Sequence, residues 1–375
     1  MKPSRTRTSA APARTDTAFM RGALALARRA LGTTWPNPAV GCVMVKEGAV
    51  IARGATAPSG RPHAETAALA AAGAAARGAT AYVSLEPCAH HGQTPPCATA
   101  LADAGIARVV YAVKDPDPRV NGGGAQLLRK ANIAVEEGLL AEEAAELNAG
   151  FFMRMREGRP LVTLKTATSL DGRIAAAGGR SQWITGEAAR AAAHALRARH
   201  DAVMIGASTL AADDPLLTVR LPGLPVRAPV RIAVAGRAMV AAGRRLFASL
   251  EAGPVWLVLA EGTAPPRDLP PGVEIVTVAA GPQGRPDPKA MLAELGRRGL
   301  TRLLVEGGAR LAGALVKAGL VDRIAWFRAP LLLGGDGVPA LEPLGVADPA
   351  AAPKWRRVDA RNFGQDLLET YAAPR

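Results

Sequence analysis

The run EPCAHHGQTPPC, residues 86–97, decides what the first part of this chain can be. It ends in Cys97, eight residues beyond Cys88, and a His-Ala-Glu triplet lies upstream at residues 63–65. Three protein ligands leave one position of a tetrahedral zinc ion open for water, whose pKa the metal lowers to about 7. We therefore expect His63, Cys88 and Cys97 to bind zinc. We expect Glu65 to lie beside the metal and to transfer the water's proton to a ring nitrogen and then to a leaving amine.

This combination of a His-x-Glu triplet with Pro-Cys and a second Cys is the signature of zinc-dependent nucleobase deaminases. Those enzymes usually have two residues between the cysteines, whereas this chain has eight, residues 89–96. The alternative is a structural zinc site, which would usually show four protein ligands. His90 or His91 could supply the fourth ligand, but we expect both to line the pocket or contact substrate. Cys42 falls on a predicted strand and is expected in the core.

Strands and helices alternate on both sides of this run, which predicts an α/β layered architecture. In the first half we expect helices at 17–31, 64–76, 97–104, 124–131 and 141–150, and strands at 39–45, 50–53, 82–85, 108–112 and 133–135. Residues 151–160 are predicted to form a polar connection. In the second half we expect helices at 186–199, 289–298 and 309–318, and strands at 161–165, 202–205, 230–234, 255–259, 274–278, 302–305 and 324–329.

The length of 375 residues exceeds what one ordinary core supports, so we expect two domains. Residues 1–15 are predicted to be a disordered tail, residues 16–153 a zinc deaminase domain and residues 154–375 a second domain. The tail contains no apolar core region, so a secretory signal is not indicated. No stretch reaches the roughly 18–20 apolar residues of a membrane helix. We expect a cytoplasmic protein that does not bind membranes.

The net charge of +14, from 46 basic and 32 acidic residues, leaves nucleic-acid binding open as an alternative. Arginines are spread through both halves, and aromatic residues make up only 4% of the chain, so little surface is available for stacking on bases. A phosphorylated small substrate or cofactor would also use positive charge. We expect no nucleic-acid partner. The three cysteines are better suited to a metal site than to a set of disulfides.

The run 86–97, together with Pro36-Asn37-Pro38-Ala39-Val40-Gly41, resembles the bifunctional riboflavin biosynthesis deaminase–reductases, the RibD family. The resemblance extends from about residue 16 to residue 372. It implies a cytidine-deaminase-like α/β/α domain followed by an α/β domain like dihydrofolate reductase. It further implies that the first domain deaminates 2,5-diamino-6-ribosylamino-4(3H)-pyrimidinone 5′-phosphate with Zn²⁺, and that the second reduces the ribosyl group to ribityl with NADPH. A homodimer or homotetramer is expected.

The resemblance also assigns cofactor and substrate contacts to individual residues. It implies cofactor contacts from Ala167, Trp183, Thr209, Asp213, Gly307, Gly308, Ala309 and Arg310. It implies substrate contacts from Asn37, Lys165, Ser181, Arg197, Leu216, Arg220 and Glu306.

Several of these residues have a physical reason to act in this way. Trp183 offers a flat face to a nicotinamide or pterin-like ring. Arg220 carries a guanidinium fork that matches a phosphate. The helix start at 307–310 can hold a pyrophosphate on its backbone amides. Without its flanking match, Asp213-Asp214-Pro215 would read as a capped turn.

One short segment departs from the family. After the strand 231–234 the family carries an Asp-Ser pair near the adenosine phosphate, whereas this sequence has Ala235-Gly236-Arg237. Arg237 is the candidate for contacting the 2′-phosphate of NADPH.

Two other interpretations stay open at this point: a zinc deaminase acting on tRNA or other nucleic acid, and a basic RNA-binding protein with a structural zinc. The long cysteine loop and the second α/β domain argue against the first. The second predicts a zinc ion with no open coordination position and tolerance of substitution at Glu65.

Overall fold

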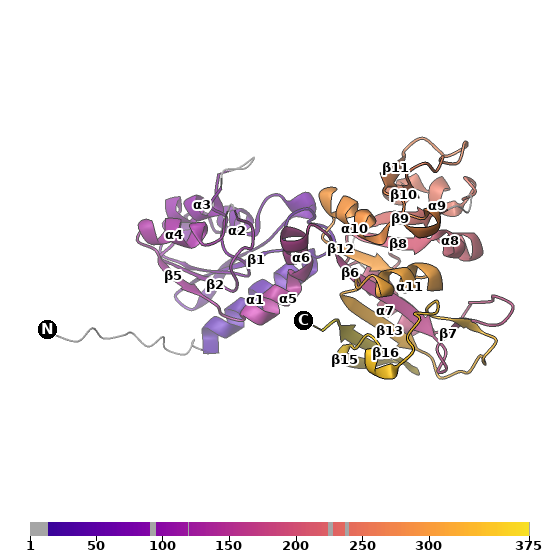
Figure 1. The fold of residues 1–375 in the computed structure, drawn as a ribbon. Coiled ribbons are helices and arrows are strands. Elements are labelled where there is room, and N and C mark those ends of the chain that lie inside the picture. Colours follow the sequence, from indigo (N-terminus) through magenta and orange to yellow (C-terminus); the bar gives the residue numbers. More distant parts are fainter. Residues whose placement is uncertain (1–13, 91–94, 119, 224–227, 237–239, 375) are drawn as a thin grey trace. The chain divides into compact units, whose positions relative to one another are not determined.

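The computed structural model describes residues 14–90, 95–118, 120–223, 228–236 and 240–374 (Figure 1). The chain divides into two compact units. The first comprises Asn37–Phe152 together with the segment that ends at Ala30, and the second comprises Met153–Arg375 together with Leu31–Pro36. Within the described ranges, no helix is both long and apolar enough to cross a membrane.

The first unit is built on a five-stranded sheet with the order β2-β1-β3-β4-β5. β1 is antiparallel to β2 and β3, while β3, β4 and β5 run parallel. Helices α1 and α5 lie together on one side of the sheet, and α2, α3 and α4 lie on the other (Figure 1). The elements are α1 (Arg14–Ala30), β1 (Gly41–Lys46), β2 (Ala49–Ala55), α2 (Ala64–Ala72), β3 (Thr80–Val83), α3 (Cys97–Asp103), β4 (Arg108–Tyr111), α4 (Gly123–Lys130), β5 (Ala134–Glu137) and α5 (Ala141–Leu147).

The predicted polar connection at 151–160 was wrong, because most of it is the helix α6 (Ala149–Glu157). The predicted helix 141–150 is likewise interrupted at Asn148, between α5 and α6. Asn148 is buried, and its side chain accepts from the Ala39 amide and donates to the Ala39 carbonyl, both at 3.0 Å. A polar side chain that satisfies a distant backbone strand explains the break. Phe151 and Phe152 are buried, which the three nearby arginines concealed in the sequence.

The second unit contains a nine-stranded sheet with the order β11-β10-β9-β8-β12-β6-β13-β16-β15. The strands from β11 to β13 are parallel, and β16 and β15 complete the sheet as an antiparallel hairpin. Its elements are β6 (Leu161–Thr168), β7 (Arg173–Ala175), α7 (Glu187–Arg197), β8 (Ala202–Gly206), α8 (Ala207–Asp213), β9 (Val230–Ala235), α9 (Arg245–Ala248), β10 (Val255–Ala260), β11 (Val273–Val278), α10 (Pro288–Arg297), β12 (Arg302–Val305), α11 (Ala309–Lys317), β13 (Arg323–Arg328), β14 (Val338–Pro339), β15 (Arg356–Phe363) and β16 (Asp366–Ala372).

Successive side chains of a strand point to opposite faces of the sheet. In the parallel part of this sheet, side chains on both faces are buried. On β8, Ala202 and Met204 pack into one buried cluster, while Val203 and Ile205 pack into the other. The strands are therefore almost continuously apolar, which is why their positions were predictable. Helix α8 and the hairpin β15–β16 were not predicted. β15 has the sequence RRVDARNF and is largely exposed, so it carries no clear apolar alternation.

Candidate active sites

The three predicted zinc ligands converge in the first unit. The ligand atoms of His63, Cys88 and Cys97 all lie within 4.8 Å of one another. The Nδ1 atom of His63 is 3.7 Å from the Sγ of Cys88 and 3.3 Å from the Sγ of Cys97. One imidazole and two thiols at this spacing fit a zinc ion with one coordination position left for a non-protein ligand.

Each ligand is positioned by the end of an element. His63 immediately precedes α2, Cys88 follows the end of β3 by five residues, and Cys97 is the first residue of α3. The backbone amide of Cys97 donates to the Sγ of Cys88 at 3.3 Å. Two helix N-termini therefore point at the site, and their positive ends favour thiolates.

The two thiols differ in their tendency to ionise. Hydrogen bonds from Cys97 and from His63 lower the pKa of Cys88 to about 4 despite partial burial. The adjacent Cys88 sulfur and burial raise the pKa of Cys97. Two sulfur atoms this close cannot both ionise without a compensating cation, which is the chemistry of a metal-binding pair.

Glu65 lies on the first turn of α2, two residues after His63, and only 4% of its surface is exposed. Burial raises the pKa of Glu65 to about 7, and the neighbouring Cys88 adds to that effect. Asn37 packs over Gly60, three residues before His63, since a Cβ atom added at Gly60 would lie 1.9 Å from the Asn37 Nδ2. His90 is half-buried, whereas His91 lies outside the described residues.

Glu86 was not predicted, although it stands two residues before Cys88. Its buried carboxylate accepts from the amides of Gly122 and Ala125, at 3.0 and 3.2 Å. Gly124 allows this approach, because a Cβ atom there would lie 1.8 Å from the Pro87 carbonyl oxygen. Glu86 thus ties the turn before α4 to the strand end that carries the zinc ligand.

In the second unit, three predicted substrate residues form one charged cluster. Glu306, which follows β12, makes a two-pronged ion pair with Arg197 of α7, with N–O distances of 2.5 and 2.9 Å. Burial opposes ionisation of Glu306, but Arg197 and Lys165 outweigh it and lower the pKa of Glu306 to about 2. Burial lowers the pKa of Lys165 on β6, while the charge of Glu306 opposes that shift. Arg197 is thus occupied by Glu306.

His194 joins this cluster and was missed in the sequence. Its Nδ1 accepts a hydrogen bond from the backbone amide of Arg220 at 3.2 Å. The guanidinium of Arg220 lies 3.4 Å from the hydroxyl of Thr218. Burial, with the positive charges of Arg197 and Arg220, lowers the pKa of His194 to about 4, so the ring is neutral at pH 7. The position of His194 one turn before Arg197 on α7 was the available signal.

The predicted cofactor residues fall on adjoining elements. Ser181 donates to the carboxylate of Asp213 at 3.0 Å, and Arg190 stacks over the ring of Trp183 at 4.7 Å. Trp183 is 68% exposed, so one face of a flat ring is available. Ala167 lies two residues beyond Lys165 on β6, which places both on the same face of the sheet.

Gly307 and Gly308 link β12 to α11 with positive φ angles of 112° and 82°. A Cβ atom added at Gly308 would lie 3.0 Å from the hydroxyl of Thr209 on α8. The backbone of the glycine pair therefore runs close to α8, just before Ala309 begins α11. Leu216 contributes its carbonyl to the buried Arg231, at 3.4 Å.

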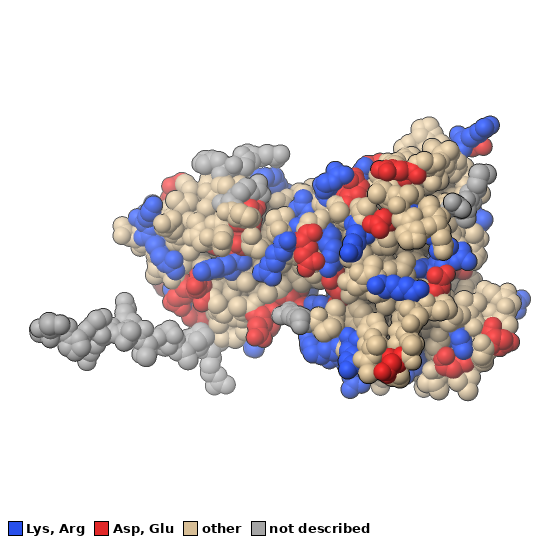
Figure 2. Space-filling model, viewed as in Figure 1, with Lys and Arg blue, Asp and Glu red and all other residues tan. Residues whose placement is uncertain are grey.

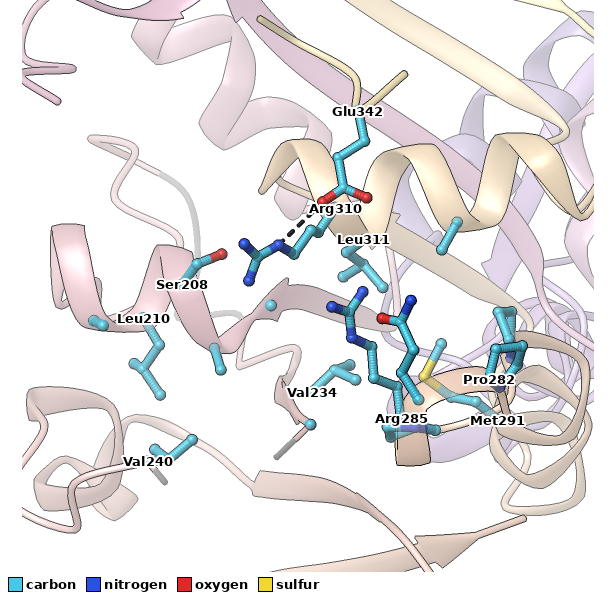
Figure 3. A pocket seen from close by; sticks show the side chains of 18 of the residues that line it. Ser208, Leu210, Val234, Val240, Pro282, Arg285, Met291, Arg310, Leu311 and Glu342 are labelled. Carbon is cyan, nitrogen blue, oxygen red and sulfur yellow. Dashed lines mark hydrogen bonds and ion pairs between the residues drawn. The ribbon is translucent and has the colours of Figure 1, made fainter. Parts of the chain in front are cut away.

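A cavity of about 1060 Å³ opens beside these residues and includes Arg310 among its lining residues (Figure 3). It lies at the carboxyl ends of β8 and β9 and is bordered by α8 and α11. Open parallel sheets bind ligands outside the carboxyl ends of their strands. Its size and cationic lining fit a dinucleotide. Arg237, the candidate for contacting the 2′-phosphate, lies outside the described residues.

The positive charge of the chain is not gathered at one place on the face shown in Figure 2, where Lys and Arg side chains alternate with Asp and Glu.

Comparisons with known proteins agree with the two-part organisation. The cytidine and deoxycytidylate deaminase zinc-binding region matches residues 13–113, and the RibD C-terminal domain matches residues 160–368. The riboflavin biosynthesis protein RibD of Haemophilus influenzae is 42% identical over 367 residues, which cover 95% of this chain and 97% of that protein. The RibD protein of Escherichia coli is also 42% identical, over 94% of this chain and 98% of its own.

Solved structures give the same result. RibD of Acinetobacter baumannii superposes with a TM-score of 0.86 at 38% identity, covering 96% of this chain and 99% of that one. A diaminohydroxyphosphoribosylaminopyrimidine deaminase/5-amino-6-(5-phosphoribosylamino)uracil reductase of Thermotoga maritima gives 0.85 at 33% identity, with the same coverage. The predicted fold class, a cytidine-deaminase-like domain followed by a dihydrofolate-reductase-like domain, is confirmed. The chain is therefore a member of the RibD family of bifunctional riboflavin biosynthesis deaminase–reductases.

Proposed function

We propose that residues 16–153 deaminate 2,5-diamino-6-ribosylamino-4(3H)-pyrimidinone 5′-phosphate and that residues 154–375 reduce the ribosyl group of the uracil product to ribityl with NADPH. The observation that carries the first half is the convergence of His63, Cys88 and Cys97 beside the buried carboxyl of Glu65. The names of the related enzymes indicate the same pair of reactions.

In the deaminase half, His63, Cys88 and Cys97 would hold Zn²⁺, which supplies a Lewis acid that activates water. Glu65 transfers one proton of the attacking water to the ring nitrogen, and then transfers the second, from the hydroxyl group so formed, to the amine that leaves as ammonia. Water adds to the amino-bearing carbon and ammonia leaves, so an amine is exchanged for a carbonyl. Burial of Glu65 shields these proton transfers from bulk water.

In the reductase half, NADPH supplies a hydride when it is bound. Arg220 binds the substrate phosphate, because a guanidinium offers two parallel donors to phosphate oxygens. Glu306, kept ionised by Arg197, accepts hydrogen bonds from ribose hydroxyls. Trp183 faces the nicotinamide, and the amides at the start of α11 bind the pyrophosphate.

A coupled assay tests this proposal. The full chain is incubated with the diaminopyrimidinone phosphate, with and without NADPH, and each product is identified by mass. We expect only the deaminated ribosyl compound without NADPH and the ribityl compound with it. Release of amine from tRNA, or absence of both products, would contradict the proposal.

A further inference from the structure

The cavity of the second unit is lined by several cationic side chains, of which only Arg310 was predicted to contact the cofactor. Its lining includes four cationic side chains, Arg244, Arg285, Arg310 and Lys317, and one carboxylate, Glu342. Glu342 is engaged by Arg310, with an Nε–Oε1 distance of 3.0 Å (Figure 3). Neither Arg244 nor Arg285 has an ion-pair partner among the residues that the structure describes. Two guanidinium groups therefore remain available to an anion in this cavity.

Arg285 is positioned beside a glycine. It comes from the connection between β11 and α10, and its stem passes over Gly236 at the end of β9. A Cβ atom at Gly236 would lie only 3.3 Å from the Cγ of Arg285 and 3.9 Å from its Cδ. The glycine at the end of β9 therefore makes room for the arginine stem. The guanidinium of Arg285 projects into the cavity that Arg310 borders from the other side (Figure 3).

The sheet order indicates which part of a dinucleotide reaches Arg285. The neighbouring strands β6, β12, β8 and β9 are parallel, so their carboxyl ends share one edge. Ala167 lies near the end of β6, the glycine pair follows β12, Thr209 follows β8, and Gly236 follows β9. At about 4.8 Å per strand, this row spans about 14 Å. A cofactor with its nicotinamide at β6 and its pyrophosphate at the start of α11 therefore extends its adenosine toward β9 and Arg285.

We propose that Arg285, together with Arg244, binds the 2′-phosphate of NADPH and selects the phosphorylated dinucleotide over NADH. This assignment rests on the proposed reductase function. The 2′-phosphate is the group that distinguishes the two cofactors, and two guanidinium groups from different loops match its charge and its several acceptor oxygens. The sequence had suggested Arg237 for this 2′-phosphate contact, and we now propose Arg285 in its place.

Calorimetric titration of the full chain with NADP⁺ and with NAD⁺ tests the assignment without requiring turnover. We expect Arg285→Ala to weaken NADP⁺ binding by about tenfold or more, and to change NAD⁺ binding by less than about twofold, because a charged hydrogen-bonded contact is lost only with NADP⁺. Arg285→Lys should fall between the two. Arg267→Ala, an exposed arginine outside the cavity, removes the same charge and should leave both affinities unchanged.

The outcomes separate the two levels of the proposal. Failure of the unaltered chain to bind NADP⁺ would overturn the proposed cofactor, and the assignment with it. Normal NADP⁺ binding by the unaltered chain, combined with an equal loss of both nucleotides or with no loss in Arg285→Ala, would overturn the role of Arg285 alone.

Discussion

Glu65 lies on the first turn of α2, two residues after the zinc ligand His63, and its carboxyl group is buried away from solvent. We expect Glu65→Gln to retain zinc and to lower deamination by about 10²-fold to 10⁴-fold, the usual contribution of a proton-transferring side chain. The amide keeps the size of the side chain but cannot accept and return a proton. Zinc content by elemental analysis and product mass give the two readouts.

The same variant carries its own control. Reduction of the already deaminated substrate should proceed at the rate of the unaltered chain, since Glu65 lies in the first unit and the predicted reductase residues lie in the second. Substantial residual deamination, with zinc bound, would remove Glu65 from its proposed role.

A second residue prediction concerns phosphate binding. Arg220→Ala should raise the KM for the phosphorylated substrate at least tenfold and leave the KM for NADPH nearly unchanged, because a charged hydrogen bond to phosphate is lost. Steady-state kinetics with each substrate varied in turn measure both constants. Arg129→Ala, an exposed arginine on α4, is the matched control. Equal increases in both constants would move Arg220 away from the phosphate.

At this scale the sequence was informative where chemistry dictates spacing. His63, Cys88 and Cys97 could be predicted because a zinc ion restricts both the ligand types and their placement on element ends. Glu86 could not, because it accepts hydrogen bonds from backbone amides that tertiary folding brings to it, and such contacts leave no local pattern. His194 also accepts a hydrogen bond from a distant backbone amide, and its only local signal was its helical spacing from Arg197. The mutual pairing of Arg197 with Glu306 was hidden for the same reason.

Helix α10 packs against the chain just after α6 through a glycine. A Cβ atom at Gly296 would lie 2.1 Å from the Gly158 carbonyl oxygen, and Arg154 donates to the Gly296 carbonyl at 2.8 Å. We expect Gly296→Ala to lower the free energy of unfolding of the second unit by about 1–3 kcal/mol, the usual cost of overpacking. Urea unfolding followed by tryptophan fluorescence measures this change.

Gly178→Ala is the control for that substitution. A Cβ atom at Gly178 has no neighbour within 4 Å, so this variant should be as stable as the unaltered chain or slightly more stable. If the two variants unfold at the same urea concentration, the close packing of α10 on residue 158 is not a stabilising constraint.

His200 links the end of α7 to β6. One ring nitrogen bonds the Leu196 carbonyl at 2.7 Å, and the other bonds the Thr163 hydroxyl at 3.0 Å, an arrangement that suits the neutral ring. Burial lowers the pKa of His200 to about 4, below the 6.5 of an unfolded histidine. The stabilisation is therefore complete above pH 6.5 and is lost as the pH falls toward 4, by about 2 kcal/mol between pH 7.5 and pH 5.

The test compares unfolding free energies of the unaltered chain and of His200→Gln at both pH values. The amide cannot titrate, so the variant should lose about 2 kcal/mol less than the unaltered chain over this interval. An equal pH dependence of the two proteins would show that His200 does not ionise on unfolding.

Among the elements, those with covered apolar faces were predictable and the others were not. Strands β8, β9 and β10 are mostly apolar because both faces of that part of the sheet are buried. Helix α6 was concealed by its arginines, although two buried phenylalanines anchor it. The hairpin β15–β16 joins the sheet through backbone pairing of β16 with β13, and the largely exposed side chains of β15 show no apolar alternation.

In the whole molecule, the zinc ligands and the fluorescent tryptophans belong to different units. The zinc ligands all lie in the first unit, whereas all five tryptophans, Trp35, Trp183, Trp256, Trp326 and Trp355, belong to the second. Metal binding stabilises the unit that supplies the ligands. We therefore expect removal of zinc by a chelator to abolish deamination while leaving the urea midpoint from tryptophan fluorescence unchanged.

Reduction of the deaminated substrate gives the decisive readout for this separation. It should continue at an unchanged rate in the chelated protein, and added Zn²⁺ should restore deamination, because His63, Cys88 and Cys97 take no part in the second unit. If chelation shifted the tryptophan midpoint or stopped reduction, the two activities would depend on one folding unit. If chelation left deamination intact, the three ligands would not hold the catalytic metal.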